Sequence, residues 1–208
     1  MKQRLLAVFL LIGVIAMPSS LVLGGEEAAT RSRYLAGQFL VAAPKMADPR
    51  FKRTVIYMIA HDAEGAMGLI VNRPFGSGRL SALMEGFGVK EPIAKELDGD
   101  VRLHYGGPVQ QGRGFILHSS DYKDVGTTIV SGDVSMTSRV EVLMAIAEGK
   151  GPKHSLFILG YAGWGAGQLE NEMARQDWTT APAELDMIFS DDPESVWRKV
   201  SKVSGLEL

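Results

Sequence analysis

The chain contains no cysteine. This absence excludes structural disulfides, thiolate nucleophiles, cysteine-ligated zinc and iron–sulfur clusters. A chain of 208 residues buries a full hydrophobic core without such cross-links. The missing cysteines therefore do not indicate a compartment. Hydrophobic residues make up 46% of the chain and charged residues 22%, which is typical of a soluble globular protein.

A basic surplus is also missing. Lysine and arginine number 22 against 24 aspartate and glutamate residues, so the net charge is −2. The densest basic group, Lys45, Arg50, Lys52 and Arg53, has Asp48 within it, and we interpret it as a solvated loop. Proteins that bind nucleic acid usually concentrate basic residues on one face or helix. Direct nucleic-acid binding is therefore not expected.

The usual signatures of catalysis and metal binding are absent as well. No Gly-x-Ser-x-Gly elbow and no His-x-x-x-His or His-Glu-x-x-His spacing occurs. Four histidines are present, His61, His104, His118 and His154. His104 and His118 fall on neighbouring predicted strands, where they would converge on a metal only with a carboxylate beside them. We favour neutral, hydrogen-bonded histidines, and predict no metal and no cofactor.

The first 33 residues differ in character from the rest. A basic start, Met1–Arg4, precedes the uncharged apolar run 5–17, which is the pattern of a signal peptide. Residues 1–24 are predicted to be a signal peptide or a membrane anchor, and 25–33 a linker. Cleavage implies export to the periplasm, whereas retention of 5–23 would provide the only contact with a membrane. A misassigned start codon would leave the protein cytoplasmic.

Apolar runs with turn signals predict a sheet built mainly from short strands. The runs around 54–60 and 66–72 are separated by a tight polar turn, which predicts a hairpin. Residues 75–78 are expected to form a loop, and 89–99 an irregular stretch. The predicted strands are 38–43, 54–60, 66–72, 101–105, 114–118, 127–130, 155–159 and 187–189.

Helical spacing of apolar residues marks four helices, at 79–87, 138–148, 168–176 and from Pro193 onward. Ser138 and Glu141 form a predicted capping box for the second. Asp192 is predicted to cap the last, with Val196, Val200 and Val203 facing inward. Strands with helices inserted between them, rather than strict alternation, indicate an α+β fold in a single domain.

The glycine-rich passage 160–167 leads into a predicted helix. A strand, glycines and a helix N-terminus together can hold an anion, although the spacing of known phosphate loops is missing. The alternative, which we favour, is that these glycines let Trp164 pack closely under the backbone. Gln168, Glu170 and Glu172 would then be N-terminal helix residues whose charges suit the helix dipole.

A second polar motif, Asn72-Arg73-Pro74, ends a predicted buried strand. A guanidinium fixed there could present a planar fork to a carboxylate or phosphate of a ligand. It could equally pair with Asp48 or Glu64 and serve only the fold. The sequence leaves both interpretations open.

Several stretches together resemble the YqgE/AlgH family. They are Leu35–Ala42, Pro44–Phe51, Thr54–Tyr57, Glu64–Pro74, Gly106–Val109, Arg113–His118, Leu159–Trp164, Gly167–Glu170 and Trp178. The resemblance covers 34–208 and implies a compact α+β domain. In that domain a largely antiparallel, partly closed β-sheet has helices packed outside. It implies no activity, although one branch carries a name linked to regulation.

We therefore expect a non-enzymatic domain that binds a small anionic ligand or a protein partner and has an indirect regulatory role. The alternative is a hydrolase or transferase that uses His118 with Glu170 or Asp48 as an acid/base pair. A third hypothesis is that the motifs serve folding alone and that the function lies in surface association. The candidate ligand-binding residues are Asp48, Asn72, Arg73, Gly107, His118, Trp164, Gln168 and Glu170.

Overall fold

The computed structural model describes residues 34–86 and 100–206. The chain divides into two units, 1–33 and Tyr34–Leu208, and only the second is described below. The predicted leader (1–24), the linker (25–33) and the irregular stretch 89–99 lie outside the described residues. In the described part of the chain, no helix is long and apolar enough to cross a membrane.

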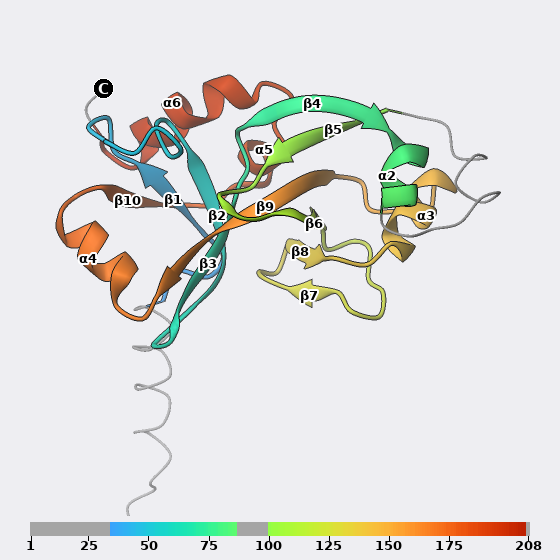
Figure 1. Cartoon of the computed structure of the whole chain (residues 1–208), viewed down its shortest axis with the longest axis horizontal. Coiled ribbons are helices and arrows are strands. Elements are labelled where there is room, and N and C mark those ends of the chain that lie inside the picture. The colour runs from blue at the N-terminus through green and yellow to red at the C-terminus, as the bar shows by residue number, and fades with distance from the viewer. Residues whose placement is uncertain (1–33, 87–99, 207–208) are drawn as a thin grey trace, which may run out of the picture. The chain divides into compact units, whose positions relative to one another are not determined.

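The domain is built on one strongly curled sheet (Figure 1), as the α+β prediction requires. Its strand order is β10-β1-β2-β3-β9-β6-β8-β7, with β5 also pairing with β9 and β4 with β5. Every described pairing is antiparallel except that of β5 with β9. The strands are β1 Gln38–Ala42, β2 Val55–Asp62, β3 Gly65–Ile70, β4 Pro74–Arg79, β5 Asp100–Tyr105, β6 Val109–Ser119, β7 Thr128–Ile129, β8 Val134–Thr137, β9 Ser155–Gly165 and β10 Trp178–Pro182.

The predicted hairpin is confirmed as β2 and β3, which pair antiparallel across a tight turn. Strand β9 is longer than predicted, because it continues through the glycine passage to Gly165. Pairing with β3 at one end and with β6 at the other holds this glycine-rich segment extended. A window of sequence does not contain those partners, so its glycines indicated a loop.

Five helices flank the sheet in the described residues: α2 Leu80–Gly86, α3 Glu141–Ala147, α4 Gln168–Ala174, α5 Leu185–Ile188 and α6 Pro193–Val203. Figure 1 shows α2 and α3 near one end of the sheet, and α4 and α6 near the other. The predicted cap of α6 is confirmed, because the Asp192 side chain accepts a hydrogen bond from the Ser195 N–H. The prediction that Val203 faces inward is wrong, since it is 64% exposed.

The predicted capping box is wrong. The helix α3 begins one turn later than expected, with Val140 at its N-cap and no side-chain cap. The Glu141 carboxylate instead accepts hydrogen bonds from the Arg139 guanidinium, including one of 3.2 Å from Nε. An adjacent arginine offers a charged donor, which outcompetes the neutral backbone N–H that a capping box would use.

Three further predictions fail for reasons of tertiary pairing. The predicted loop 75–78 is strand β4, which is held extended by β5 despite its two glycines. The predicted strand 187–189 is the region of helix α5, which buries Ile188 beneath it. Strands β8 and β10 were not predicted, because polar and small residues give them no strong β pattern.

The core lies on both faces of the sheet. On one face, Phe39, Tyr57 and Val196 belong to a cluster covered by α5 and α6. On the other face, a cluster that includes Trp164 and Trp178 lies beneath α4. A third cluster packs under α2 and α3. Successive side chains of β1 and β2 point to opposite faces of the sheet and pack into the clusters on both. Both strands are therefore almost completely buried.

Candidate functional site

The loop between β1 and β2 carries Asp48 and is held in one shape by its own residues. The Asp48 carboxylate accepts hydrogen bonds from the Arg50 backbone N–H at 2.9 Å and from its guanidinium at 2.6 Å. The hydrogen-bonded guanidinium lowers the pKa of the Asp48 carboxyl below its ordinary value. The pair stands at the rim of the molecule, with the Arg50 side chain 59% exposed.

Asn72 and Arg73 hold this loop through hydrogen bonds to its backbone. The Asn72 Oδ1 accepts from the Val55 N–H at 2.8 Å, and its Nδ2 donates to the Arg53 carbonyl at 2.9 Å. The Arg73 guanidinium donates to the Lys52 carbonyl at 2.7 Å and also to the Arg50 carbonyl. Arg73 therefore pairs with neither Asp48 nor Glu64, and its fork is directed at backbone carbonyls.

A tryptophan pair with a shared carboxylate lies across from the loop. Trp164 and Trp178 both donate from their indole Nε1 to Oε2 of Glu172, at 2.9 and 2.8 Å. The other oxygen of Glu172 accepts from Gln168 Nε2 at 2.9 Å. The two indole rings meet edge to face, 6.0 Å apart. Phe51 meets the Trp178 ring in the same way at 5.4 Å.

Glu172 was not among the candidate site residues. The only signal in the sequence is its spacing of four residues from Gln168, which places both side chains on one face of a helix. Nothing local indicates that Trp178, from the next strand, also reaches this carboxylate. With three N–H donors directed at it, Glu172 fixes both indoles at once.

Between the loop and α4 lies an open cleft of about 460 Å³. Its mouth carries two arginine–aspartate pairs, Arg50–Asp48 at 2.6 Å and Arg175–Asp177 at 2.9 Å. Both arginine side chains are more than half exposed. Apart from the Met46–Phe51 loop segment, the lining consists of Pro108, Val109, Gly163, Trp164, Gln168, Glu172, Arg175, Asp177 and Trp178.

The glycine passage carries Trp164 into the core. Trp164 is only 7% exposed, packed on β9 beneath α4, as the favoured interpretation of the passage predicted. Gly167, at φ +72°, provides the left-handed residue from which α4 begins. The N–H of Gly165, the last residue of β9, donates to Gln168 Oε1 at 3.2 Å.

Glu170 lies on the other side of α4 and pairs with His61. The His61 Nε2 is 3.1 Å from Glu170 Oε1, while its Nδ1 accepts from the Leu35 backbone N–H at 3.2 Å. Because Nδ1 accepts, the ring proton of neutral His61 is on Nε2 and is donated to Glu170. Glu170 therefore holds His61, which in turn binds the backbone near the start of the domain, and it does not line the cleft.

His118 is remote from both of its proposed acid/base partners. It is fully buried, pairs with Ser155 at the first residue of β9, and donates from Nδ1 to the Ser119 carbonyl at 2.9 Å. Trp164 is near the opposite end of this 11-residue strand. About 30 Å of strand separates the two positions, at roughly 3.3 Å per residue. The structure does not bring His118 to Glu170 or Asp48.

The two buried strand histidines do not converge either. Strand β9 lies between β5, which carries His104, and β6, which carries His118. The His104 Nδ1 donates to the Val71 carbonyl at 3.0 Å. Nowhere in residues 34–86 and 100–206 do three histidine or carboxylate side chains gather as metal ligands would.

Burial of His104 predicts a loss of stability in mild acid. Burial lowers the pKa of His104 from 6.5 to about 4, and burial lowers the pKa of His118 too. As the pH falls from about 6.5 towards 4, His104 therefore binds a proton in the unfolded chain but stays neutral in the native state. We expect His104 to cost up to about 3 kcal/mol of stability over that window, and no more below it.

His104→Asn tests this expectation, because the asparagine amide can replace the Nδ1–H donor to Val71 but does not titrate. Urea unfolding at a series of pH values from 7.5 to about 4 measures the slope. The variant should show a flatter pH dependence than the wild type. Equal slopes in the two proteins would contradict the assignment to His104.

Gly107 has a backbone role beside the cleft. Its φ is +150°, and a Cβ at this position would lie 2.2 Å from the Tyr161 carbonyl carbon. The chain turns here from β5 into β6 directly against the middle of β9. Gly107 therefore sets how closely the Pro108 and Val109 edge of the cleft approaches β9.

Known proteins are similar to this chain over almost the whole domain. An AlgH-like family model matches residues 39–208. The chain belongs to the AlgH-like family. A UPF0301 protein of Methylococcus capsulatus is 47% identical over 172 residues, covering 83% of this chain and 92% of the relative. A UPF0301 protein of Rhodopseudomonas palustris is 44% identical over 192 residues, covering 88% of each chain.

Solved structures agree with the AlgH-like fold. The solution structure of the AlgH protein from Pseudomonas aeruginosa matches with a TM-score of 0.68 and 40% identity. It covers 84% of this chain and 90% of that protein. A crystal structure of a Corynebacterium diphtheriae protein, at 24% identity and a TM-score of 0.63, shares the fold. The family resemblance read from the sequence motifs is thus confirmed, while no activity follows from it.

The eight candidate residues of this AlgH-like domain fall into three groups. Asp48, Trp164 and Gln168 line the cleft. Asn72, Arg73 and Gly107 shape the backbone around it. His118 and Glu170 lie elsewhere.

Proposed function

We propose that this AlgH-like domain is a non-enzymatic binding module whose site is the cleft between the β1–β2 loop and α4. The observation that carries the proposal is the shared Glu172 carboxylate, which fixes two indoles as the floor of an open cleft. Preformed concave sites with an apolar floor and a few oriented polar groups are typical of ligand-binding proteins. A regulatory role would then be indirect, exerted through the bound ligand or partner.

The chemistry of the rim supports an anionic group on the ligand. Asp48 holds Arg50, and Asp177 holds Arg175, so both guanidinium groups are oriented before a ligand arrives. Each guanidinium has five N–H donors, and each aspartate occupies only part of them. The remaining donors suit a carboxylate or phosphate, while the apolar body of the ligand would contact Phe51 and Val109.

A small organic anion and an acidic segment of a partner protein share this chemistry. Benzoate and a short capped peptide of alternating glutamate and leucine serve as probes for the two sources. We expect saturable binding of at least one probe, with Arg50→Ala and Arg175→Ala each weakening it about three- to tenfold. Isothermal titration calorimetry measures the affinities. Comparison of benzoate with the peptide shows whether a small organic anion or an acidic protein segment fits the cleft.

Arg198→Ala is the matched control, because Arg198 is an exposed arginine on α6, outside the cleft. This variant should bind as the wild type does. Equal losses in all three variants would indicate a general effect of charge and would contradict the cleft as the site. Binding that is insensitive to Arg50 and Arg175 would contradict it as well.

A second proposal concerns the compartment in which the domain works. The basic start and the apolar run 5–17 favour cleavage and export over a retained anchor or a later start. We propose that the mature domain works outside the cytoplasm. Sequencing the N-terminus of the protein recovered from cells tests this: a chain that starts at Met1 or near Tyr34 would contradict cleavage near Gly24.

A further inference from the structure

The sheet has a free edge at β10. Among residues 34–86 and 100–206 this strand pairs with β1 alone, and it is longer than β7, the strand at the opposite end of the sheet path. Strands at an edge carry a row of backbone donors and acceptors that another strand can use. The residues of β10 are Trp178, Thr179, Thr180, Ala181 and Pro182, with no charge among them.

The hydrogen-bonding pattern shows which groups of β10 point away from β1. Ala43 N–H donates to the Asp177 carbonyl at 2.9 Å, so this pair is hydrogen-bonded. In an antiparallel ladder every second residue repeats that role, so Thr179 also faces β1. Thr180 and Trp178 therefore direct their backbone groups outward. Within the described residues, neither outward N–H has an acceptor.

The opposite side of β1 gives an independent check. Ala42 N–H donates to the Thr54 carbonyl at 3.0 Å, so residue 42 faces β2. Its neighbours along β1, Val41 and Ala43, must then direct their backbone groups to β10. This agrees with the Ala43–Asp177 hydrogen bond described above. The outward row of β10 thus consists of Trp178, Thr180 and the carbonyl of Pro182, because proline has no N–H.

We propose that two copies of this chain join at β10, antiparallel across a two-fold axis centred on Thr180. Each Thr180 N–H would donate to the Thr180 carbonyl of the other copy. Each Trp178 N–H would donate to the Pro182 carbonyl. Pro182 ends the pairing in both directions, which fixes its register. Such a contact uses the same surface on both copies and covers the β10 edge of each.

The charges flanking β10 complement themselves in this register. Two residues beyond Pro182 stands Glu184, whose backbone is still extended. The register places it near Gln176 of the other copy, whose φ of +60° ends the extended chain. Beside Gln176 is Arg175, and the Lys45 ammonium donates to the Arg175 carbonyl at 2.9 Å. Arg175 is paired with Asp177 of its own copy at 2.9 Å, so Lys45 is the cation that faces Glu184 at each end of the junction.

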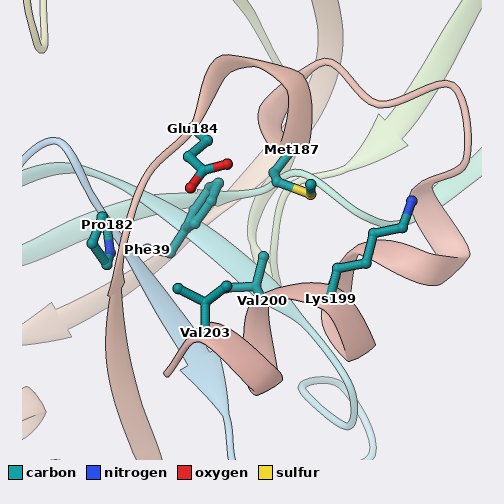
Figure 2. Close-up of a pocket in the computed structure, with 7 residues that line it drawn as sticks. All are labelled: Phe39, Pro182, Glu184, Met187, Lys199, Val200 and Val203. Atoms are coloured by element: carbon teal, nitrogen blue, oxygen red, sulfur yellow. The ribbon is translucent and has the colours of Figure 1, made fainter. Parts of the chain in front are cut away.

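Apolar surface lies along the same edge. Figure 2 shows a hollow where α5 and α6 meet the end of β10, with Phe39, Pro182, Val200 and Val203 around it. Its volume is about 60 Å³, too small for an organic ligand but able to receive one methyl-bearing side chain. Val203 is 64% exposed in the single chain. Joining two copies at β10 brings both hollows beside the junction, where this surface would be covered.

Thr180→Pro tests the junction with little effect on the single chain. Thr180 directs its N–H outward, so a proline there removes no bond to β1, as is usual for prolines in edge strands. Sedimentation velocity of the purified wild type at about 100 µM should give about twice the mass of its single chain. Thr180→Pro should sediment as a single chain with an almost unchanged melting temperature.

Thr179→Pro is the matched control, because Thr179 directs its N–H to β1 and a proline there should lower the melting temperature. Glu184→Lys gives a second test that leaves β10 intact. It should weaken the dimer at least about tenfold, and adding Lys45→Glu should restore part of the loss. A wild type that is monomeric at about 100 µM overturns the proposal, as does a dimer that survives both Thr180→Pro and Glu184→Lys.

Discussion

Replacing Gly107 with alanine is expected to lower the free energy of unfolding by about 3–5 kcal/mol. Two costs add at this position. The new Cβ would lie 2.2 Å from the Tyr161 carbonyl carbon and 2.3 Å from its oxygen, so one of two backbone segments must move. The φ of +150° is also a conformation that alanine rarely adopts. Chemical denaturation of wild type and variant measures the change.

Gly112→Ala is the control for this substitution. Gly112 lies in β6, the strand that follows Gly107, but a Cβ there has no atom within 4 Å and its φ is not in the left-handed region. It should change the stability by less than about 1 kcal/mol. A Gly107→Ala protein as stable as Gly112→Ala would contradict the close approach of the β5–β6 turn to β9.

Replacing Glu172 with leucine is expected to destabilise the domain by about 2–5 kcal/mol and to abolish binding in the cleft. The substitution leaves the indole N–H groups of Trp164 and Trp178 without their acceptor in a largely buried setting. Each buried donor that loses its partner costs about 1–3 kcal/mol. Thermal unfolding and benzoate titration follow the two effects separately.

Glu172→Gln separates the hydrogen bonds from the charge. A glutamine keeps a carbonyl oxygen that can accept from both indoles, so most of the stability should remain. If Glu172→Gln were as unstable as Glu172→Leu, the negative charge would be the decisive feature, and the shared-acceptor account would be wrong. Stability of Glu172→Leu equal to the wild type would contradict that account entirely.

The sequence was informative where a local pattern determines the structure. Apolar runs bounded by turn signals predicted β1, β2 and β3, and Asp192 followed by Pro193 predicted the start of α6. The same local reasoning failed at Glu141, where a neighbouring arginine supplied a stronger partner than the helix backbone. Strand β9 was cut short, since its glycines are held extended by strands distant in the sequence.

The candidate site was predictable only in part, for a related reason. Asp48, Trp164 and Gln168 were identified from motifs, and the cleft brings them together. Glu172 was missed, because its importance comes from Trp178, which reaches it from another strand. Arg73 looked like a ligand-binding group, yet its donors are directed at loop carbonyls that no sequence pattern marks.

The chain's three tryptophans offer the most direct test of the cleft as the binding site. Trp164 and Trp178 donate to Glu172 at its floor, while Trp197 donates to the Ala42 carbonyl, beneath α6. The indole N–H signals can be followed by ¹⁵N-edited NMR during titration with benzoate, benzamide and benzylammonium. These probes share a ring and differ in charge.

We predict that benzoate shifts the signals of Trp164 and Trp178 saturably, leaves Trp197 unmoved, and binds more tightly than the neutral and cationic probes. Shifts at Trp197 alone, or no saturable shift with any probe, would contradict the cleft as the binding site. Tighter binding of benzylammonium would contradict the anionic ligand.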